Sequence, residues 1–193
     1  MERPFQMIAI GVSAGGMRAL SHILPAFPEG FPMAIVIVQH VRCDAGDLMA
    51  SVLEVHTVLP IKEADEKEPI HAGHMYIAPA GYHLLVEPDR TFSLSVDAKV
   101  NYARPSIDVL FESAADVYGE QLVGVILTGA NTDGSKGLRR VAEYGGLTVV
   151  QDPESAEVDQ MPRAALATAP VDHVVSLKEI GSFLVKLGGR DPR

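Results

Sequence analysis

The stretch AIGVSAGGMRAL, residues 9–20, decides the fold class, because it carries the chain from an apolar strand into a helix across a glycine-rich turn. The run MIAIGV (7–12) is continuously apolar, as expected of a strand buried on both faces of a parallel sheet. GMRALSHIL (16–24) then has apolar residues at helical spacing. The turn between them either cradles a phosphate on backbone amides or presents Ser13 as a nucleophile.

The same alternation of apolar strands and amphipathic helices continues along the chain. The predicted strands are 33–39, 122–129, 147–152 and 173–176, with shorter apolar runs at 59–64 and 74–80; the predicted helices are 45–55, 105–119, 135–146, 161–169 and one opened by a capping box from Ser176 to Glu179. Residues 83–96 read as a β-hairpin around Pro88-Asp89-Arg90. These elements predict a single α/β domain over residues 1–193. Its fold is doubly wound and Rossmann-like, a mostly parallel sheet with helices on both faces and one antiparallel hairpin.

Composition excludes several classes of protein. The formal net charge of the 193 residues is −9 and no Lys/Arg cluster stands out, which argues against a nucleic-acid partner. The single cysteine, Cys43, permits no internal disulfide and favours a reducing compartment. No signal peptide is visible, and no apolar run approaches the roughly 18 residues of a membrane span. The sequence therefore predicts a cytoplasmic protein without membrane insertion.

Three reactive side chains come directly after predicted strands. Ser13 follows the first strand, His40 follows the second, and Asp133 follows the strand at 122–129. In an open parallel sheet, ligands bind beyond the carboxyl ends of the strands, so these side chains are expected at one edge. A serine hydroxyl needs an imidazole to take its proton, and an acid holds the imidazole in the correct tautomer. The placement predicts a Ser-His-Asp site.

The glycine-rich turn fits this reading better than phosphate binding. Its third position is Ser13 where a dinucleotide fingerprint needs glycine, and Met17-Arg18 does not complete a Walker A motif. The spacing Gly11-x-Ser13-x-Gly15 matches G-x-S-x-G, although the order serine, histidine, aspartate is not that of α/β-hydrolases. The amides of Ala14, Gly15 and Gly16 are expected to bind the oxyanion. A structural turn serine is the alternative to a nucleophile.

Other reactive residues are weaker candidates. Asp108 and Asp44 resemble first-turn helix residues more than a triad acid. Cys43 has no base of its own besides His40. The histidines at positions 71, 74 and 83 lack the cysteine or carboxylate company of a zinc site, so we expect no metal and no cofactor.

Six segments together resemble the catalytic domain of CheB, the chemotaxis protein-glutamate methylesterase family. They are AIGVSAGGMRAL (9–20), IVIVQHV (35–41), YIAPAGYHLLVE (76–87), RPSIDVLFESAA (104–115), GVILTGANTDGSKGL (124–138) and QDPESAEVDQMPRAAL (151–166). The resemblance runs from about residue 8 to 184. It implies a doubly wound serine hydrolase with Ser13 as nucleophile, His40 as base and Asp133 as acid. It also implies that methyl esters of receptor glutamates are the substrates, methanol is released, and receptor glutamines are deamidated.

The sequence departs from the family pattern around the expected substrate loop. The family's Gly-Met-Gly is Gly129-Ala130-Asn131 here, and its HRPS motif is ARPS, residues 103–106. Ala130, Asn131, Thr132 and Arg104 are therefore the candidates for substrate contact. The family enzymes carry an N-terminal receiver domain, whereas this chain starts a few residues before the first strand. We therefore expect an isolated catalytic domain, constitutively open or controlled by a separate response regulator.

Three functions stay open on the sequence alone. The first is demethylation of a chemoreceptor or receptor-like protein. The second is hydrolysis of a different ester or amide, suggested by the altered loop at Ala130. The third is a non-catalytic binding or regulatory module of the same fold.

Overall fold

A seven-stranded parallel sheet forms the centre of the computed structural model, which describes residues 4–40 and 49–189. The strand order is β3-β4-β2-β1-β7-β8-β9. The strands are β1 (Met7–Val12), β2 (Ala34–Gln39), β3 (Ile61–Glu63), β4 (Met75–Ile77), β7 (Leu122–Ile126), β8 (Leu147–Gln151) and β9 (His173–Val175). Every pairing in this sheet is parallel.

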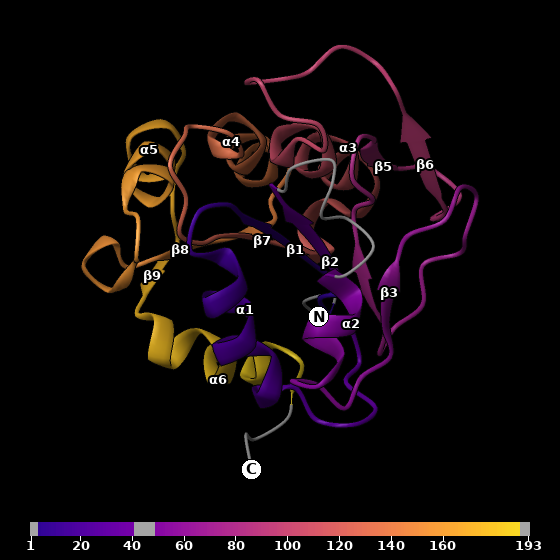
Figure 1. Cartoon of the computed structure of the whole chain (residues 1–193), viewed down its shortest axis with the longest axis horizontal. Helices are drawn as coiled ribbons and strands as arrows, with labels where there is room; N and C mark the ends of the chain where they lie inside the picture. The colour runs from indigo at the N-terminus through magenta and orange to yellow at the C-terminus, as the bar shows by residue number, and fades with distance from the viewer. Residues whose placement is uncertain (1–3, 41–48, 190–193) are drawn as a thin grey trace.

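Helices cover both faces of this sheet (Figure 1). One layer holds α3 (Ile107–Tyr118), α4 (Ser135–Glu143) and α5 (Gln160–Thr168); the other holds α1 (Gly16–Ile23), α2 (Met49–Glu54) and α6 (Leu177–Leu187). Short 3₁₀ turns occupy Leu24–Ala26, Gly119–Gln121 and Pro153–Ser155. Side chains of β1 alternate between the two cores: Ala9 packs with the α3 layer, and Ile8 and Ile10 with the α1 layer. The predicted doubly wound fold is confirmed.

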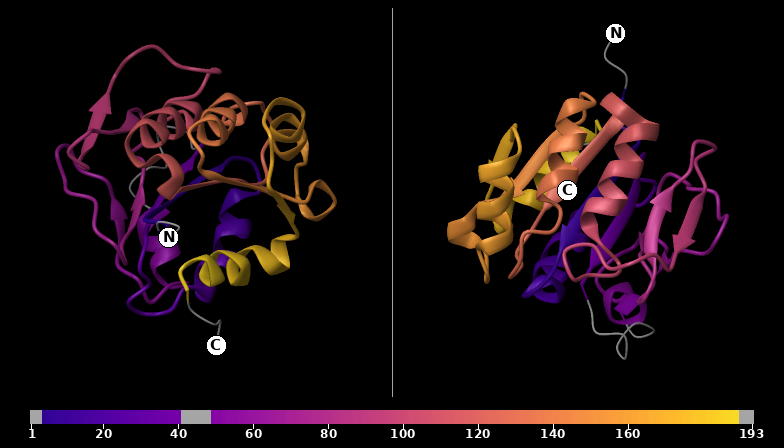
Figure 2. Two further views of the ribbon diagram at one scale, coloured as in Figure 1. Left: turned by 180° about the vertical axis from the view of Figure 1, so that it is seen from behind. Right: turned by 90° about the horizontal axis from the view of Figure 1, so that it is seen from above.

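The antiparallel hairpin lies apart from the main sheet, beside α3 (Figure 2). It consists of β5 (His83–Val86) and β6 (Phe92–Ser95), as the turn residues predict. The Val86 amide donates to Ser113 Oγ on α3 at 3.1 Å, which ties the hairpin to the helix. The hairpin and the loop after it therefore lead directly to the start of α3.

Several predicted elements differ from the structure in their bounds or caps. The strand predicted over 122–129 ends at Ile126, because the Thr128 amide donates to the Gln151 side chain and leaves the ladder. The Ser176 hydroxyl donates to the Glu179 carboxylate at 2.6 Å and does not cap a backbone amide, so the two side chains of the expected capping box bond to each other instead. The first residues of the helix predicted over 45–55 lie outside the described residues.

The point at which the strand order reverses lies between β1 and β7. The helix after β1, α1, covers one face, and the helix after β7, α4, covers the other (Figure 1). The connections that leave these adjacent strands therefore diverge, and in open α/β sheets ligands bind at this point, beyond the carboxyl ends of the strands. Within residues 4–40 and 49–189, no helix combines the length and apolarity needed to cross a membrane.

Candidate active site

His40 and Asp133 form a close pair at the carboxyl edge of the sheet. His40 Nε2 lies 2.8 Å from Asp133 Oδ2, with the Asp133 side chain fully buried and the His40 side chain 13% exposed. Ser13 follows β1 next to this pair, because the His40 amide donates to the carbonyl of Val12 at 3.1 Å. Among the described residues, Ser13 Oγ makes no hydrogen bond. The structure thus brings the expected base and acid into contact and places the serine directly after the neighbouring strand.

The Asp133 carboxylate sits at the N-terminus of α3 and accepts five hydrogen bonds. Oδ2 accepts from His40 Nε2 and from the amide of Ile107 at 2.7 Å. Oδ1 accepts from Ser106 Oγ at 2.8 Å, from Asn101 Nδ2 at 3.0 Å and from the Asp108 amide at 3.3 Å. Burial alone would raise the pKa of Asp133, but the bonds from His40, Asn101 and Ile107 outweigh burial and hold it at about 2. Asp133 is therefore ionised and fixed in place.

The Asp108 carboxyl group accepts a hydrogen bond from the start of the neighbouring helix, α4. Asp108 lies in the first turn of α3, as expected, and its Oδ1 accepts from the Gly137 amide in the first turn of α4 at 2.7 Å. Asn101 Nδ2 donates to its other oxygen at 2.8 Å and so links the two carboxylates. Burial, with a contribution from nearby Asp133, raises the pKa of Asp108 to about 6. The two acids therefore carry different charges in weakly acidic solution.

Ionisation of Asp108 is expected to lower the free energy of unfolding as the pH rises from about 4 to 7. The folded state holds this proton up to about pH 6, whereas the unfolded chain releases it near 3.8, so ionising the folded protein costs free energy. The loss is on the order of 2 kcal/mol. Urea unfolding of wild type and Asp108→Asn at pH 4.5 and pH 7.0 measures it. The variant is expected to gain stability relative to wild type by that amount at the higher pH, and an unchanged difference would contradict the assignment.

The turn that carries Ser13 is held by a side chain of β2 and by the backbone of the segment that follows β7. Gln39 Nε2 donates to the Ser13 carbonyl at 2.9 Å, and the Ser13 amide donates to the Thr128 carbonyl at 3.0 Å. A Cβ at Gly16 would collide with Gln39 Oε1, so this glycine is required for packing. Gly15 has a φ of +77°, which favours glycine there as well. Sequence reasoning missed Gln39 and Thr128, because neither belongs to a reactive pattern.

The expected oxyanion amides are not equivalent. The Gly16 N–H already donates to the Ser13 carbonyl at 2.9 Å. The N–H groups of Ala14 and Gly15 have no acceptor within the part of the chain that the structure describes. Ala14 and Gly15 are therefore better placed than Gly16 to bind an oxyanion, and this role stays a prediction for all three.

Comparison with known proteins identifies the family. A family model described as CheB methylesterase matches residues 8–184. The chain belongs to the CheB methylesterase family. This confirms the resemblance and the methylesterase class predicted from the sequence.

The relatives extend along nearly the whole chain. A "Putative protein-glutamate methylesterase/protein-glutamine glutaminase" of Leptospira interrogans is 51% identical over 183 residues, covering 95% of both chains. The "Protein-glutamate methylesterase FrzG" of Myxococcus xanthus is 37% identical over 95% of this chain and 55% of its own length. The crystal structure of the Thermotoga maritima CheB methylesterase catalytic domain matches with a TM-score of 0.91 at 34% identity, covering 96% of this chain and 100% of that one.

The loop that departs from the CheB pattern lies over His40. Ala130 and Thr132 are exposed, and no comparison tests their expected contact with substrate. Asn131 is half-buried, and its Nδ2 lies 3.0 Å from His40 Nδ1. Asn131 thus contacts the candidate base, which sequence reasoning did not anticipate because the residue was considered only for substrate contact.

Arg104 and His83, two other residues considered from the sequence, hydrogen-bond to backbone groups in this CheB family member. Arg104 Nη1 donates to the carbonyls of Val96 and Asp97 at 2.5 and 2.8 Å, so the guanidinium braces the loop before α3, and its contact with substrate stays a prediction. His83 is buried between the Ala98 carbonyl at 3.0 Å and the Ser106 amide at 3.2 Å. In the described ranges, no three His, Cys, Asp or Glu residues gather as a metal site would require.

Residues 41–48 lie outside the described part of the chain. The predictions made for Arg42 as a basic residue near the site, for Cys43 and for Asp44 fall in this segment.

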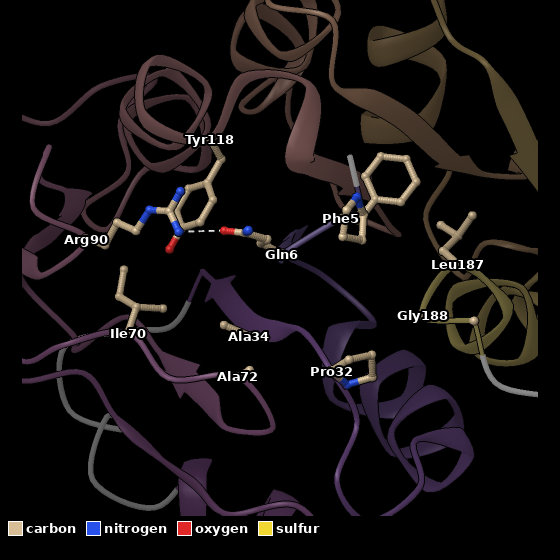
Figure 3. Close-up of a pocket in the computed structure, with 12 residues that line it drawn as sticks. Phe5, Gln6, Pro32, Ala34, Ile70, Ala72, Arg90, Tyr118, Leu187 and Gly188 are labelled. Carbon is tan, nitrogen blue, oxygen red and sulfur yellow. Dashed lines mark hydrogen bonds between the residues drawn. The ribbon is translucent and has the colours of Figure 1, made fainter. Parts of the chain in front are cut away.

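A cavity of about 540 Å³ lies at the amino ends of the strands, opposite the carboxyl ends that carry the candidate active site of this CheB family member (Figure 3). It is lined by residues at the amino ends of β1 and β2, among them Gln6 and Ala34. Arg90 Nη1 donates to Gln6 Oε1 at 2.6 Å, and the guanidinium lies 4.9 Å from the centre of the Tyr118 ring. The strands separate this cavity from the candidate active site at their carboxyl ends.

Proposed function

We propose that this chain hydrolyses glutamate methyl esters on chemoreceptor-like proteins and releases methanol. The observation that carries the proposal is the 2.8 Å pair of His40 and Asp133 at the strand ends beside Ser13, in a chain of the CheB methylesterase family. The relatives named as glutaminases support a second reaction at the same site, in which a receptor glutamine is deamidated and ammonia leaves in place of methanol.

The mechanism follows from the contacts of His40. Nε2 carries the proton shared with Asp133, so Nδ1 carries the lone pair that can accept a proton; in the structure this lone pair faces Asn131 Nδ2 at 3.0 Å. Ser13 Oγ attacks the ester carbonyl while its proton passes to His40 Nδ1, and the carbonyl electrons move onto the oxygen near the Ala14 and Gly15 amides. Collapse expels the methoxy group, which takes the proton from Nδ1 and leaves as methanol.

Water completes the reaction at the acyl-enzyme. His40 Nδ1 removes a proton from the water as its oxygen attacks the glutamyl ester of Ser13. The second tetrahedral intermediate returns the proton to Ser13 Oγ and releases the glutamate carboxylic acid, which ionises in water. Throughout, the Asp133 carboxylate stabilises the imidazolium through Nε2–H, and its pKa of about 2 keeps it charged.

A second candidate keeps this chemistry and changes the substrate to another ester or amide. The altered loop favours it, because Ala130 replaces the family's methionine and Asn131 places a carboxamide over His40. A non-catalytic module is the third candidate. The single-domain organisation, control by a separate response regulator and a cytoplasmic location stay predictions.

The wild-type chain, tested with a methylated receptor fragment, small esters and a fluorophosphonate label, separates these candidates. A receptor fragment with radiolabelled glutamate methyl esters is expected to release methanol, and a fluorophosphonate is expected to label Ser13. Labelling and hydrolysis of small esters without methanol release from the receptor would favour the second candidate. Correctly folded protein that takes no label would favour the non-catalytic module.

A further inference from the structure

Asn131 completes a closed ring of hydrogen bonds around the candidate base. Asn131 Oδ1 accepts from the amide of Asp133 at 3.0 Å. Its Nδ2 reaches His40 Nδ1 at 3.0 Å, and His40 Nε2 reaches Asp133 Oδ2 at 2.8 Å. Each of the three residues is therefore hydrogen-bonded to the other two.

The backbone determines the direction of every bond in this ring. The Asp133 amide can only donate, so the Asn131 atom that faces it is the carboxamide oxygen. The carboxamide nitrogen then faces His40 and donates, which requires His40 Nδ1 to be an unprotonated acceptor. The remaining ring proton lies on Nε2, opposite a carboxylate that is ionised, with a pKa of about 2. One backbone amide thus determines the tautomer of the base.

We propose that Asn131 is a positioning residue that caps the base nitrogen of His40 and keeps it unprotonated until substrate binds. The inference rests on the proposed function, in which His40 Nδ1 takes the proton of Ser13. A ring-nitrogen lone pair accepts one good hydrogen bond, so while Asn131 holds Nδ1, Ser13 Oγ is not paired with it. This agrees with the absence of a bond to Ser13 Oγ among the described residues.

Release of the cap couples the serine to the base. When an ester carbonyl occupies the site, Ser13 Oγ–H replaces the Asn131 N–H at Nδ1, and the freed N–H faces the reacting group. The glycine found at this position in the family pattern has no side chain that could do this. The cap is therefore a feature of the Gly129-Ala130-Asn131 loop of this chain.

The substitution Asn131→Asp tests the cap with little change in shape. The new carboxylate still accepts from the Asp133 amide and preserves the turn, but it presents an acceptor to His40 Nδ1. At pH 8, ¹⁵N spectra of the wild type are expected to show His40 with Nδ1 unprotonated and Nε2 protonated. In the variant both nitrogens are expected to be protonated, and kcat/KM is expected to fall about 100-fold because the base is already occupied.

Two further variants keep the test decisive. Lys136→Gln makes the same change in net charge at an exposed position of α4 and is expected to leave the spectra and the rate unchanged. Asn131→Gly removes the cap, so Nδ1 stays unprotonated and fluorophosphonate labels Ser13 several-fold faster than in the wild type. Labelling no faster than wild type would overturn the cap.

The spectra separate this inference from the proposed function. A wild-type His40 with a proton on Nδ1, or an unprotonated Nδ1 in Asn131→Asp, overturns the cap whatever the substrate. A wild type with the expected tautomer that takes no fluorophosphonate overturns the proposed function and leaves the hydrogen-bond ring in place.

Discussion

Ser13→Ala is expected to lower the rate of methanol release by at least about 10⁴-fold. The loss is this large because no acyl-enzyme can form without the hydroxyl oxygen, and His40 and the turn amides are left to act on water alone. Steady-state release of labelled methanol from a methylated receptor fragment measures the effect. Folding is expected to be unaffected, since the Ser13 hydroxyl makes no hydrogen bond among the described residues and only the backbone of Ser13 is held.

Ser182→Ala is the matched control for this experiment. Ser182 lies on α6, away from the strand ends, and among the described residues its hydroxyl bonds only the carbonyl of Glu179 within its own helix. This variant is expected to retain the wild-type rate. If Ser13→Ala, with an unchanged melting temperature, released methanol at the wild-type rate, the proposed mechanism would be wrong.

Asp133→Asn is expected to impair both catalysis and stability. An amide nitrogen opposite His40 Nε2 would force the imidazole into the tautomer that carries its proton on Nδ1, where it cannot accept the Ser13 proton. A loss of about 10⁴-fold in kcat is expected from the wrong tautomer. The same assay of methanol release, together with the rate of fluorophosphonate labelling, measures this part.

The expected loss of stability in Asp133→Asn comes from the donors at the start of α3. Both carboxylate oxygens accept from N–H groups, Oδ2 from Ile107 and His40, and Oδ1 from Asn101 and Asp108. An amide nitrogen in either position therefore leaves buried donors unsatisfied, at a cost of roughly 1–3 kcal/mol for each group. Urea unfolding is expected to show a loss of at least about 2 kcal/mol.

Asp116→Asn makes the same chemical change on the exposed side of α3. Asp116 pairs with Arg140 at 3.1 Å, with 54% of the aspartate side chain exposed. Such a pair contributes about 1 kcal/mol or less. Asp116→Asn is therefore expected to keep full activity and nearly full stability. If Asp116→Asn and Asp133→Asn lost activity and stability equally, the role assigned to Asp133 would be wrong.

Much of the fold could be predicted from the sequence, because the apolar runs of a doubly wound sheet have a simple period. The continuous run ending at Val12 and the alternating helix after it are local features. The positions of Ser13, His40 and Asp133 after three strands could be read in the same way, since parallel strands bring their carboxyl ends to one edge. The pairing of His40 with Asp133 follows from that geometry.

The partners of the pair could not be predicted, because they depend on how separate elements dock. Asn101 lies in the loop after the hairpin, and only the packing of that hairpin on α3 brings its side chain between Asp108 and Asp133. Nothing in the local sequence marks Ser106 as a donor to a carboxylate that follows it by 27 positions. Gln39 likewise gains its role only when β2 lies beside β1.

The sequence by itself determined the glycine-rich turn after the first strand, the strand-end placement of three reactive residues and the family to which they point. The tertiary structure decided which atoms of those residues meet. It decided that Gly16 makes room for Gln39, that hydrogen bonds from His40, Asn101 and the Ile107 amide keep Asp133 ionised, and that Asn131 faces Nδ1 of His40. The physical reason is that hydrogen-bond direction and burial depend on groups far apart in the chain, whereas apolar periodicity is local.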